Sequence, residues 1–131
     1  MSNPVHILLV EDVVADVELA QHEIRKAVKD VVFQQVDTQS EFLKALETFQ
    51  PDVILSDVRM PGMDGLEFLR AYRTSGGRAI LLMMSAHGSE ESAIAAMREG
   101  AYDYLHKPFR PDEVLLTLRK VEEREGLRRE V

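Results

Sequence analysis

Five short apolar runs alternate with longer segments of helical period, and this alternation constrains the fold more than any other feature of the sequence. Strands that alternate with helices form right-handed βαβ units, which together produce a parallel sheet. We therefore predict an α/β fold, a doubly wound five-stranded parallel sheet with helices on both faces. The strands are expected at Val5–Val10, Val31–Val36, Val53–Ser56, Ala79–Met84 and Ala101–Leu105.

The segments between these runs carry apolar residues at the spacing of amphipathic helices. An apolar stripe of this kind forms the side of a helix that packs against a core. The predicted stripes consist of Val13, Val17, Ala20, Ile24, Ala27 and Val28; Phe42, Leu43, Leu46 and Phe49; Leu66, Leu69 and Tyr72; Ile94 and Met97; and Val114, Leu115, Leu118 and Val121.

Residues with capping chemistry stand where these helices should begin and end. Thr38–Glu41 and Asp64–Glu67 each place a capping oxygen three residues before a glutamate, as a capping box requires. Gly76, Gly77 and Gly100 are placed to end helices, where a left-handed residue is needed. The helix boundaries therefore agree with the division into strands and helices.

Size and charge restrict the class of protein. The chain has 131 residues, which suits one domain with its own core, and a formal net charge of −7. Such an acidic domain is not expected to bind nucleic acid, which demands a basic face, but it suits a cation or a basic partner surface. No apolar run approaches the roughly 20 residues that span a bilayer, so we expect no membrane segment. The absence of cysteine excludes disulfides and thiolate metal sites, and it permits a cytoplasmic location.

Polar residues follow four of the five predicted strands. The first strand leads to Glu11 and Asp12, the third to Asp57, the fourth to Ser85 and the fifth to Lys107. All strands of a parallel sheet end at the same edge, and open α/β folds bind ligands there. We therefore expect three carboxylates, one hydroxyl and one lysine to converge at this edge.

Three carboxylates at one edge repel each other. At about 5 Å and an effective dielectric constant near 20, each ionised pair costs about 3 kcal/mol. Lys107 supplies one positive charge, and a divalent cation would neutralise the rest. Mg²⁺ prefers a few carboxylates together with water and phosphate oxygens, whereas zinc is disfavoured because the histidines lack ligand spacing.

This environment makes Asp57 a candidate nucleophile for a phosphoryl group. A carboxylate beside Mg²⁺ and a lysine can form an acyl phosphate, while the protein supplies position and charge neutralisation. Ser85 could donate a hydrogen bond to one phosphoryl oxygen, and Lys107 could pair with another. The turn at Met60–Gly62 is expected to keep the backbone after Asp57 non-helical.

Four motifs in this order resemble the receiver domain of bacterial response regulators, which act in two-component signalling. They are VED at 10–12, SDVRMPGMDGLEFL at 56–69, MSAHG at 84–88 and GAYDYLHKPF at 100–109. The resemblance covers residues 5–121 and implies the flavodoxin-like receiver fold. The sequence of residues 93–109 is most similar to that of receivers of the nitrogen-regulator class of enhancer-binding transcription activators.

The resemblance implies a role for each carboxylate. Asp57 would accept a phosphoryl group from a phosphohistidine on a sensor histidine kinase. Asp12, Asp57 and the main-chain carbonyl of Arg59 would bind Mg²⁺ directly, and Glu11 would act mainly through water. The domain would then be a signalling module with self-catalysed phosphoryl transfer and slow autodephosphorylation, not an enzyme.

The resemblance also implies how the domain would respond. Ser85 would be the switch hydroxyl, Tyr104 the switch aromatic, and Lys107 the lysine that pairs with the phosphoryl group. Phosphorylation would switch protein–protein association and so regulate an output such as transcription. The expected dimer face combines the helix near Ser89–Glu99, the strand Ala101–Leu105 and the helix that starts at Pro111.

The receiver domain is assigned to residues 1–121. Residues 122–131, which are dense in charge, would be the end of the last helix or the start of a linker to an output domain. Two alternatives remain open. A Mg²⁺-dependent phosphatase would need a substrate cap, and the sequence has no inserted lid segment. A degenerate receiver that serves only as an interaction module would normally have lost the aspartate or the lysine.

Overall fold

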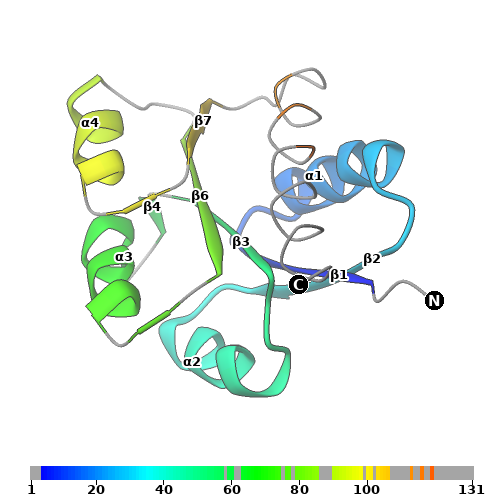
Figure 1. Ribbon diagram of the computed structural model, residues 1–131, viewed down its shortest axis with the longest axis horizontal. Helices are drawn as coiled ribbons and strands as arrows, with labels where there is room; N and C mark the ends of the chain where they lie inside the picture. Colours follow the sequence, from blue (N-terminus) through cyan, green and yellow to red (C-terminus); the bar gives the residue numbers. More distant parts are fainter. Residues whose placement is uncertain are drawn as a thin grey trace, which may run out of the picture.

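The computed structural model describes residues 4–57, 59–60, 63–74, 76–77, 79–85, 90–98, 100–101, 103–106, 113, 116 and 119. The strands of the main sheet alternate with helices along this part of the chain, as predicted (Figure 1). The strands are β1 (Val5–Val10), β2 (Val31–Val36), β3 (Val53–Asp57), β4 (Arg59–Met60), β5 (Met63–Asp64), β6 (Ile80–Ser85) and β7 (Asp103–His106). The helices are α1 (Val14–Ala27), α2 (Gln39–Thr48), α3 (Gly65–Thr74) and α4 (Glu90–Arg98).

Five strands form one parallel sheet in the order β2-β1-β3-β6-β7. This order places β3 at the centre, between β1 and β6, and it is the order of the flavodoxin-like doubly wound fold. The predicted fold class is therefore confirmed.

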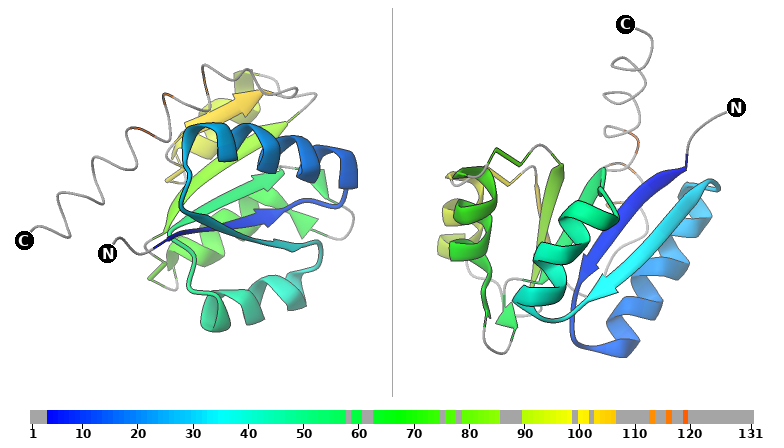
Figure 2. Two further views of the ribbon diagram at one scale, coloured as in Figure 1. Left: turned by 90° about the vertical axis from the view of Figure 1, so that its right-hand side faces the viewer. Right: turned by 90° about the horizontal axis from the view of Figure 1, so that it is seen from below.

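Two apolar clusters lie on opposite faces of this sheet. On one face, Ile24 of α1 packs with Leu9 and Leu55. On the other face, Phe42 of α2 and Leu69 of α3 belong to a cluster that also includes Ala96 of α4. The views in Figures 1 and 2 agree with this arrangement, with α1 on one side of the strands and α3 and α4 together on the other. Both faces are covered, which explains why the central strands are almost entirely apolar.

The structure adds a short hairpin that the sequence analysis did not predict. Residues 59–60 pair antiparallel with residues 63–64, with Arg59 opposite Asp64 and Met60 opposite Met63. Met60 is non-helical, as expected, whereas Pro61 and Gly62 of the predicted turn lie outside the described residues; α3 begins directly after β5.

The strand boundaries differ slightly from the predicted ones. Ladder pairing of Asp57 with Met84 extends β3 to Asp57, and pairing of Ser85 with His106 extends β6 to Ser85. Two candidate site residues are thus the last residues of their strands instead of the first residues after them. Their backbones are consequently fixed by the sheet.

Several predicted stripe residues were wrongly assigned to the core. Val13, Leu43, Ile94 and Met97 are 46 to 54% exposed. Val13 precedes α1 in an extended conformation, so it lies outside the helical period. Among the described side chains of α4, Ala96 is buried and packs against the sheet, whereas Ile94 and Met97 lie on the outer side.

The remaining stripe residues divide into two groups. Ala20, Ile24, Val28, Phe42, Leu69 and Tyr72 are buried, and Val17, Leu46 and Phe49 are partly buried, as predicted. The side chains of Ala27 and Leu66, the stripe at 114–121 and the segment 122–131 lie outside the described part of the structure.

The predicted capping box at Thr38 is confirmed, whereas the side chains of Asp64 and Glu67 lie outside the described part of the structure. The hydroxyl oxygen of Thr38 accepts a hydrogen bond from the amide of Glu41 at 3.1 Å and donates one to the Glu41 carboxylate at 3.2 Å. Gly76 and Gly100 have positive φ, 91° and 105°, as predicted for helix ends. Gly77 also takes part in the end of α3, through its amide, but it does not have the expected positive φ; a Cβ at this position would overlap the ring of Tyr72.

No helix in the described ranges is both long enough and apolar enough to cross a membrane.

Candidate functional site

The carboxyl ends of β1 and β3 meet at the edge where the sequence predicted the site. Val10 is aligned with Ser56 across these neighbouring strands. Asp57 follows Ser56 on β3, and Glu11 and Asp12 follow Val10. The parallel register therefore brings three acidic residues from two distant parts of the sequence to one place.

Glu11 is the most buried of the three, with 1% of its surface exposed. Its Oε2 accepts hydrogen bonds from the amides of Asp12 at 3.0 Å and Val13 at 3.4 Å. These amides belong to the connection between β1 and α1, just before α1 begins at Val14. The Glu11 carboxylate thus holds the β1–α1 connection in place.

The main chain of Glu11 is fixed as well. Its amide donates to the carbonyl of Val36 at 3.0 Å, and its carbonyl accepts from the side-chain amide of Gln35 at 2.7 Å. Sequence reasoning missed Gln35. Its only signal was a pair of polar residues, Gln34 and Gln35, near the end of a strand whose other residues are apolar.

Asp12 is exposed and Asp57 is half-buried. Within the described ranges, no three His, Cys, Asp or Glu side chains gather closely enough to hold a metal ion. The predicted Mg²⁺ ligands require fewer side chains, since they combine Asp12 and Asp57 with the main-chain carbonyl of Arg59. Mg²⁺ usually keeps several water ligands, and the exposure of Asp12 leaves access for water. The donor set is entirely oxygen and therefore fits Mg²⁺.

Ser56 is a second residue that sequence reasoning missed. It is 1% exposed, and its hydroxyl donates to the carbonyl of Asp57 at 3.3 Å. A serine buried in the strand thus donates to the main-chain carbonyl of the candidate nucleophile, Asp57. A polar residue at the end of the Val53–Leu55 run was the available signal.

The remaining predicted site residues lie on the neighbouring strands. Ser85 is the last residue of β6 and follows Met84, the residue that is paired with Asp57. The side chain of Ser85 is outside the described part of the structure. Tyr104 on β7 is aligned with Met83 and packs, partly buried, against the cluster that contains Met83. Lys107 follows directly after β7 and is not among the described residues.

The model of one protein family, the response regulator receiver domain, matches residues 7–119. Among curated proteins, the DNA-binding transcriptional regulator NtrC of Klebsiella pneumoniae is 44% identical over 79 residues, which are 60% of this chain and 17% of that protein. The C4-dicarboxylate transport transcriptional regulatory protein DctD of Rhizobium meliloti is 32% identical over 111 residues, which are 80% of this chain and 24% of that protein. The chain thus spans only about a fifth of the length of these relatives.

Solved structures agree with this match. The receiver domain of the Francisella response regulator 1452 has a TM-score of 0.75 and 29% identity, and the likeness covers 94% of this chain and 99% of that one. A signal receiver domain from Colwellia psychrerythraea 34H has a TM-score of 0.85 at 19% identity, covering 91% of this chain and 98% of that one, and supports the fold alone. The chain belongs to the response regulator receiver domain family and is a signalling domain of the two-component type.

Proposed function

We propose that Asp57 accepts a phosphoryl group from a phosphohistidine on a sensor histidine kinase. One observation carries this proposal: Val53–Ser56 are buried, whereas Asp57, the last residue of the same strand, is half-exposed beside Glu11 and Asp12. The central strand therefore delivers a single carboxylate to the ligand-binding edge of the sheet.

The proposed reaction is a direct phosphoryl transfer. A carboxylate oxygen of Asp57 attacks the phosphorus atom, so that a P–O bond forms while the P–N bond to the kinase imidazole breaks. The bonding electron pair leaves with the imidazole nitrogen, which takes up a proton. Attack by water on the phosphorus atom later restores the carboxylate and releases inorganic phosphate. The chain serves both steps by positioning the reacting groups, as is typical of phosphoryl transfer.

The predicted ligands would hold Mg²⁺ in this reaction. Asp12, Asp57 and the main-chain carbonyl of Arg59 would bind it directly, with Glu11 acting mainly through water. When bound, Mg²⁺ neutralises the charge of the phosphoryl oxygens. Ser85 and Lys107 would bind these oxygens from the β6 and β7 side of the site.

The test of this proposal is the intact mass after incubation with acetyl phosphate, a small phosphoryl donor. The wild-type chain should gain one acid-stable, base-labile phosphoryl group with Mg²⁺ and none with EDTA. Asp57→Asn should gain none. Equal modification of Asp57→Asn, or modification that EDTA leaves unchanged, would show that the nucleophile is assigned wrongly.

We further propose that the phosphoryl group acts through Ser85 and Tyr104. Ser85 would move toward the phosphoryl group, and Tyr104 would enter the space that this movement vacates. The alignment of Tyr104 with Met83, two residues before Ser85 on the neighbouring strand, supports a short path between them. A charge gained at Asp57 can act only through an element that has two arrangements.

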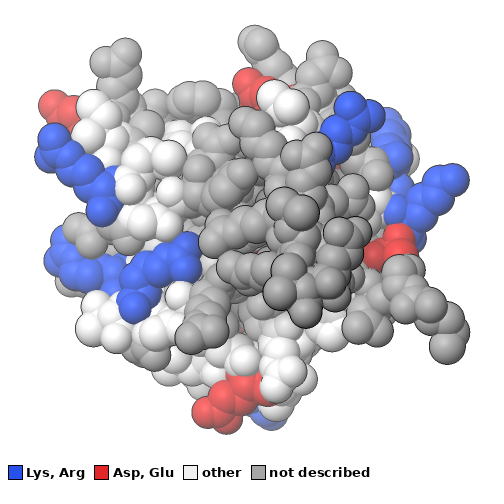
Figure 3. All heavy atoms as spheres, in the orientation of Figure 1, with Lys and Arg blue, Asp and Glu red and all other residues white. Residues whose placement is uncertain are grey.

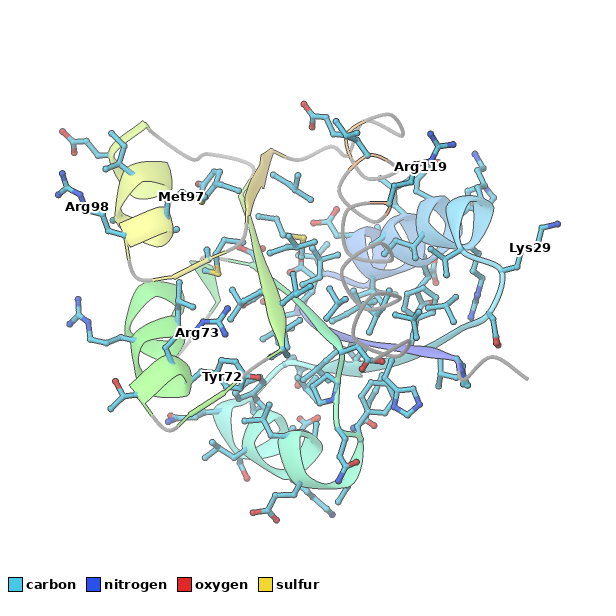
Figure 4. All side chains as sticks on the ribbon, in the orientation of Figure 1. Lys29, Tyr72, Arg73, Met97, Arg98 and Arg119 are labelled. Atoms are coloured by element: carbon cyan, nitrogen blue, oxygen red, sulfur yellow. The ribbon has the colours of Figure 1, made fainter. Side chains whose placement is uncertain are left out.

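The proposed output of this switch is self-association through α4, β7 and the last helix. Support comes from the surface of α4, which exposes Ile94, Met97 and Arg98. Figure 3 shows acidic, basic and uncharged atoms side by side over this region, and Figure 4 places Met97 and Arg98 on α4. An apolar pair flanked by charge suits a symmetric dimer contact.

Sedimentation velocity with beryllofluoride, which stands in for the phosphoryl group, tests this output. The mimic should shift the chain toward dimer, and Ser85→Ala should weaken the shift. Charge reversal at Arg98 or Arg119, both exposed, should reduce dimerisation. A dimer that is equally strong with and without the mimic would contradict the proposal.

The wider setting is part of the same proposal. Because NtrC and DctD are transcriptional regulators by name, we propose transcription as the regulated output, in the cytoplasm. The acidic receiver itself would not contact DNA.

A further inference from the structure

The helices α3 and α4 end in the same way, at neighbouring positions in the fold. At the end of α3, the amide of Gly77 donates to the carbonyl of Tyr72 at 3.0 Å, and Gly76 donates to Arg73 at 3.1 Å. At the end of α4, Ala101 donates to Ala96 at 3.0 Å, and Gly100 donates to Met97 at 3.2 Å. Both pairs have the Schellman pattern, with a glycine of positive φ after each helix.

The side chain of Arg73 joins these two helix ends. One terminal nitrogen of its guanidinium donates to the carbonyl of Gly77 at 3.0 Å, and the other donates to the carbonyl of Gly100 at 3.1 Å. The same group lies 5.6 Å from the ring centre of Tyr72. Figure 4 shows Tyr72 and Arg73 on α3, next to α4 with Met97 and Arg98.

Arginine suits this position for two reasons. Its planar fork can reach two carbonyl groups at once, whereas lysine has one point charge. A positive charge is also favourable at the carboxyl end of a helix, and Arg73 is placed at two such ends. The half-buried position of Arg73 reduces screening by solvent.

We infer that Arg73 is a positioning residue for α4: in the position that the structure shows, it fastens the carboxyl end of α4 to α3 through the carbonyl of Gly100. The link between Arg73, Gly77 and Gly100 is here named the Arg73 latch. This inference rests on the proposed function insofar as α4 takes part in the response to phosphorylation. The amino end of α4 follows directly after β6 and residues 86–89, so a change at Ser85 reaches α4 at the end opposite the latch.

The latch has a consequence for the switch. If α4 has a resting and a responding position, a contact present only in the resting position biases the equilibrium toward rest. Removing the Arg73 side chain should therefore populate the responding position before any phosphoryl group is bound. Ile94 and Met97, exposed on α4, would move with the helix.

Hydrogen exchange of the chain without any phosphoryl mimic tests the latch itself. In Arg73→Met, the amides of Gly100 and Ala101 should exchange about tenfold faster, as expected for the loss of charge-assisted hydrogen bonds. Arg70→Met, which removes an exposed arginine from the same helix, is the matched control and should leave both amides unchanged. The amide of Val28, which donates to Ile24 at the end of α1, is the internal reference. Unchanged exchange in Arg73→Met, or an equal increase at Val28, would overturn the latch.

The methyl resonance of Met97 separates positioning from simple stabilisation. In Arg73→Met, this resonance should move part of the way toward its position in the wild-type chain with beryllofluoride, and Arg73→Lys should move less. A Met97 resonance that stays at the resting position while the helix end exchanges faster would show that Arg73 only stabilises the fold. If the wild-type chain does not respond to beryllofluoride, the proposed function fails, while the exchange experiment still decides on the latch.

Discussion

The central strand β3 has an aspartate at each end, and the two aspartates are used in different ways. Asp52 precedes the strand and Asp57 ends it, and both are half-buried. The Asp52 carboxylate accepts from the amide of His6 on β1 at 2.9 Å, while the amide of Asp52 donates to the His6 carbonyl at 2.8 Å. Asp57 lies at the opposite edge, beside the acidic pair that follows β1. Residue type and burial alone therefore do not separate a structural carboxylate from a candidate nucleophile; the neighbouring groups do.

Two further contacts at the amino edge of the sheet also involve His6 and Asp52. The ring of His6 stacks on Phe49, with 4.8 Å between the ring centres, and its Nδ1 donates to the Phe49 carbonyl at 2.8 Å. The carbonyl of Asp52 accepts from the amide of Ile80 at 3.0 Å, which ties the start of β6 to the same corner. The main-chain groups of His6, Asp52 and Ile80 at this edge are thus bonded within the chain, and the Asp52 carboxylate takes part in these bonds.

The largest difference between the two aspartates should appear in phosphoryl uptake. Asp57→Asn removes the proposed nucleophile, so uptake from acetyl phosphate should fall below detection. Asp52→Asn keeps an acceptor oxygen for His6 and leaves the carboxyl edge intact, so uptake should continue at a rate close to that of the wild type. Phosphate-affinity electrophoresis of both variants checks this pair. Loss of uptake in both would mean that the two edges are not independent.

The free energy of unfolding should depend more on Asp52 than on the acidic residues at the carboxyl edge. Asp52→Ala leaves the amide of His6 without its acceptor and should lower the free energy of unfolding by about 2 kcal/mol. Urea denaturation monitored by circular dichroism in EDTA measures this effect, with Asp12→Ala at the carboxyl edge as the control. A larger loss for Asp12→Ala than for Asp52→Ala would reverse the assignment of structural and functional carboxylates.

Glu11 sharpens the comparison because it lies at the carboxyl edge but is bonded like a residue of the amino edge. Glu11→Gln keeps one acceptor oxygen for the amides of Asp12 and Val13 and should cost about 1 kcal/mol of unfolding free energy. The same urea titration in EDTA tests it. A more stable Glu11→Gln variant would indicate that repulsion among the acidic residues outweighs the hydrogen bonds of Glu11.

The sequence predicted what depends on pattern and topology. The order of elements, the covered faces of the sheet and the edge where the acidic residues meet all follow from alternation and from parallel pairing. The burial of Glu11 was not predictable, because it depends on where α1 begins relative to β1. The exposure of Ile94 and Met97 depends equally on which side of α4 reaches the sheet.

Contacts between distant segments could not be predicted from the sequence either. Gly77 was predicted only as a helix end, yet it also makes room for the Tyr72 ring, whose hydroxyl accepts from the amide of Ala79 at 2.9 Å. Similarly, nothing in the local sequence of Arg73 indicates that it reaches Gly100, 27 residues away. Such contacts are fixed by helix packing, which periodicity describes only as a buried or an exposed side.

The smallest expected effect concerns Asp12, and its sign should depend on the metal. In EDTA, Asp12→Asn removes one of the mutually repelling carboxylates and should raise the free energy of unfolding by a few tenths of a kcal/mol, because exposed charges are well screened. With millimolar Mg²⁺ the order should reverse, since a ligand that binds only the folded state stabilises the wild type in proportion to its occupancy. Thermal denaturation in EDTA and in Mg²⁺ measures the stability difference between Asp12→Asn and the wild type under both conditions. Asp52→Asn is the control, and its response to Mg²⁺ should match that of the wild type. The contradicting outcome is an Asp12→Asn variant that is less stable than the wild type in EDTA and gains as much stability from Mg²⁺ as the wild type. Asp12 would then not belong to the proposed metal site, and it would be a structural carboxylate like Asp52.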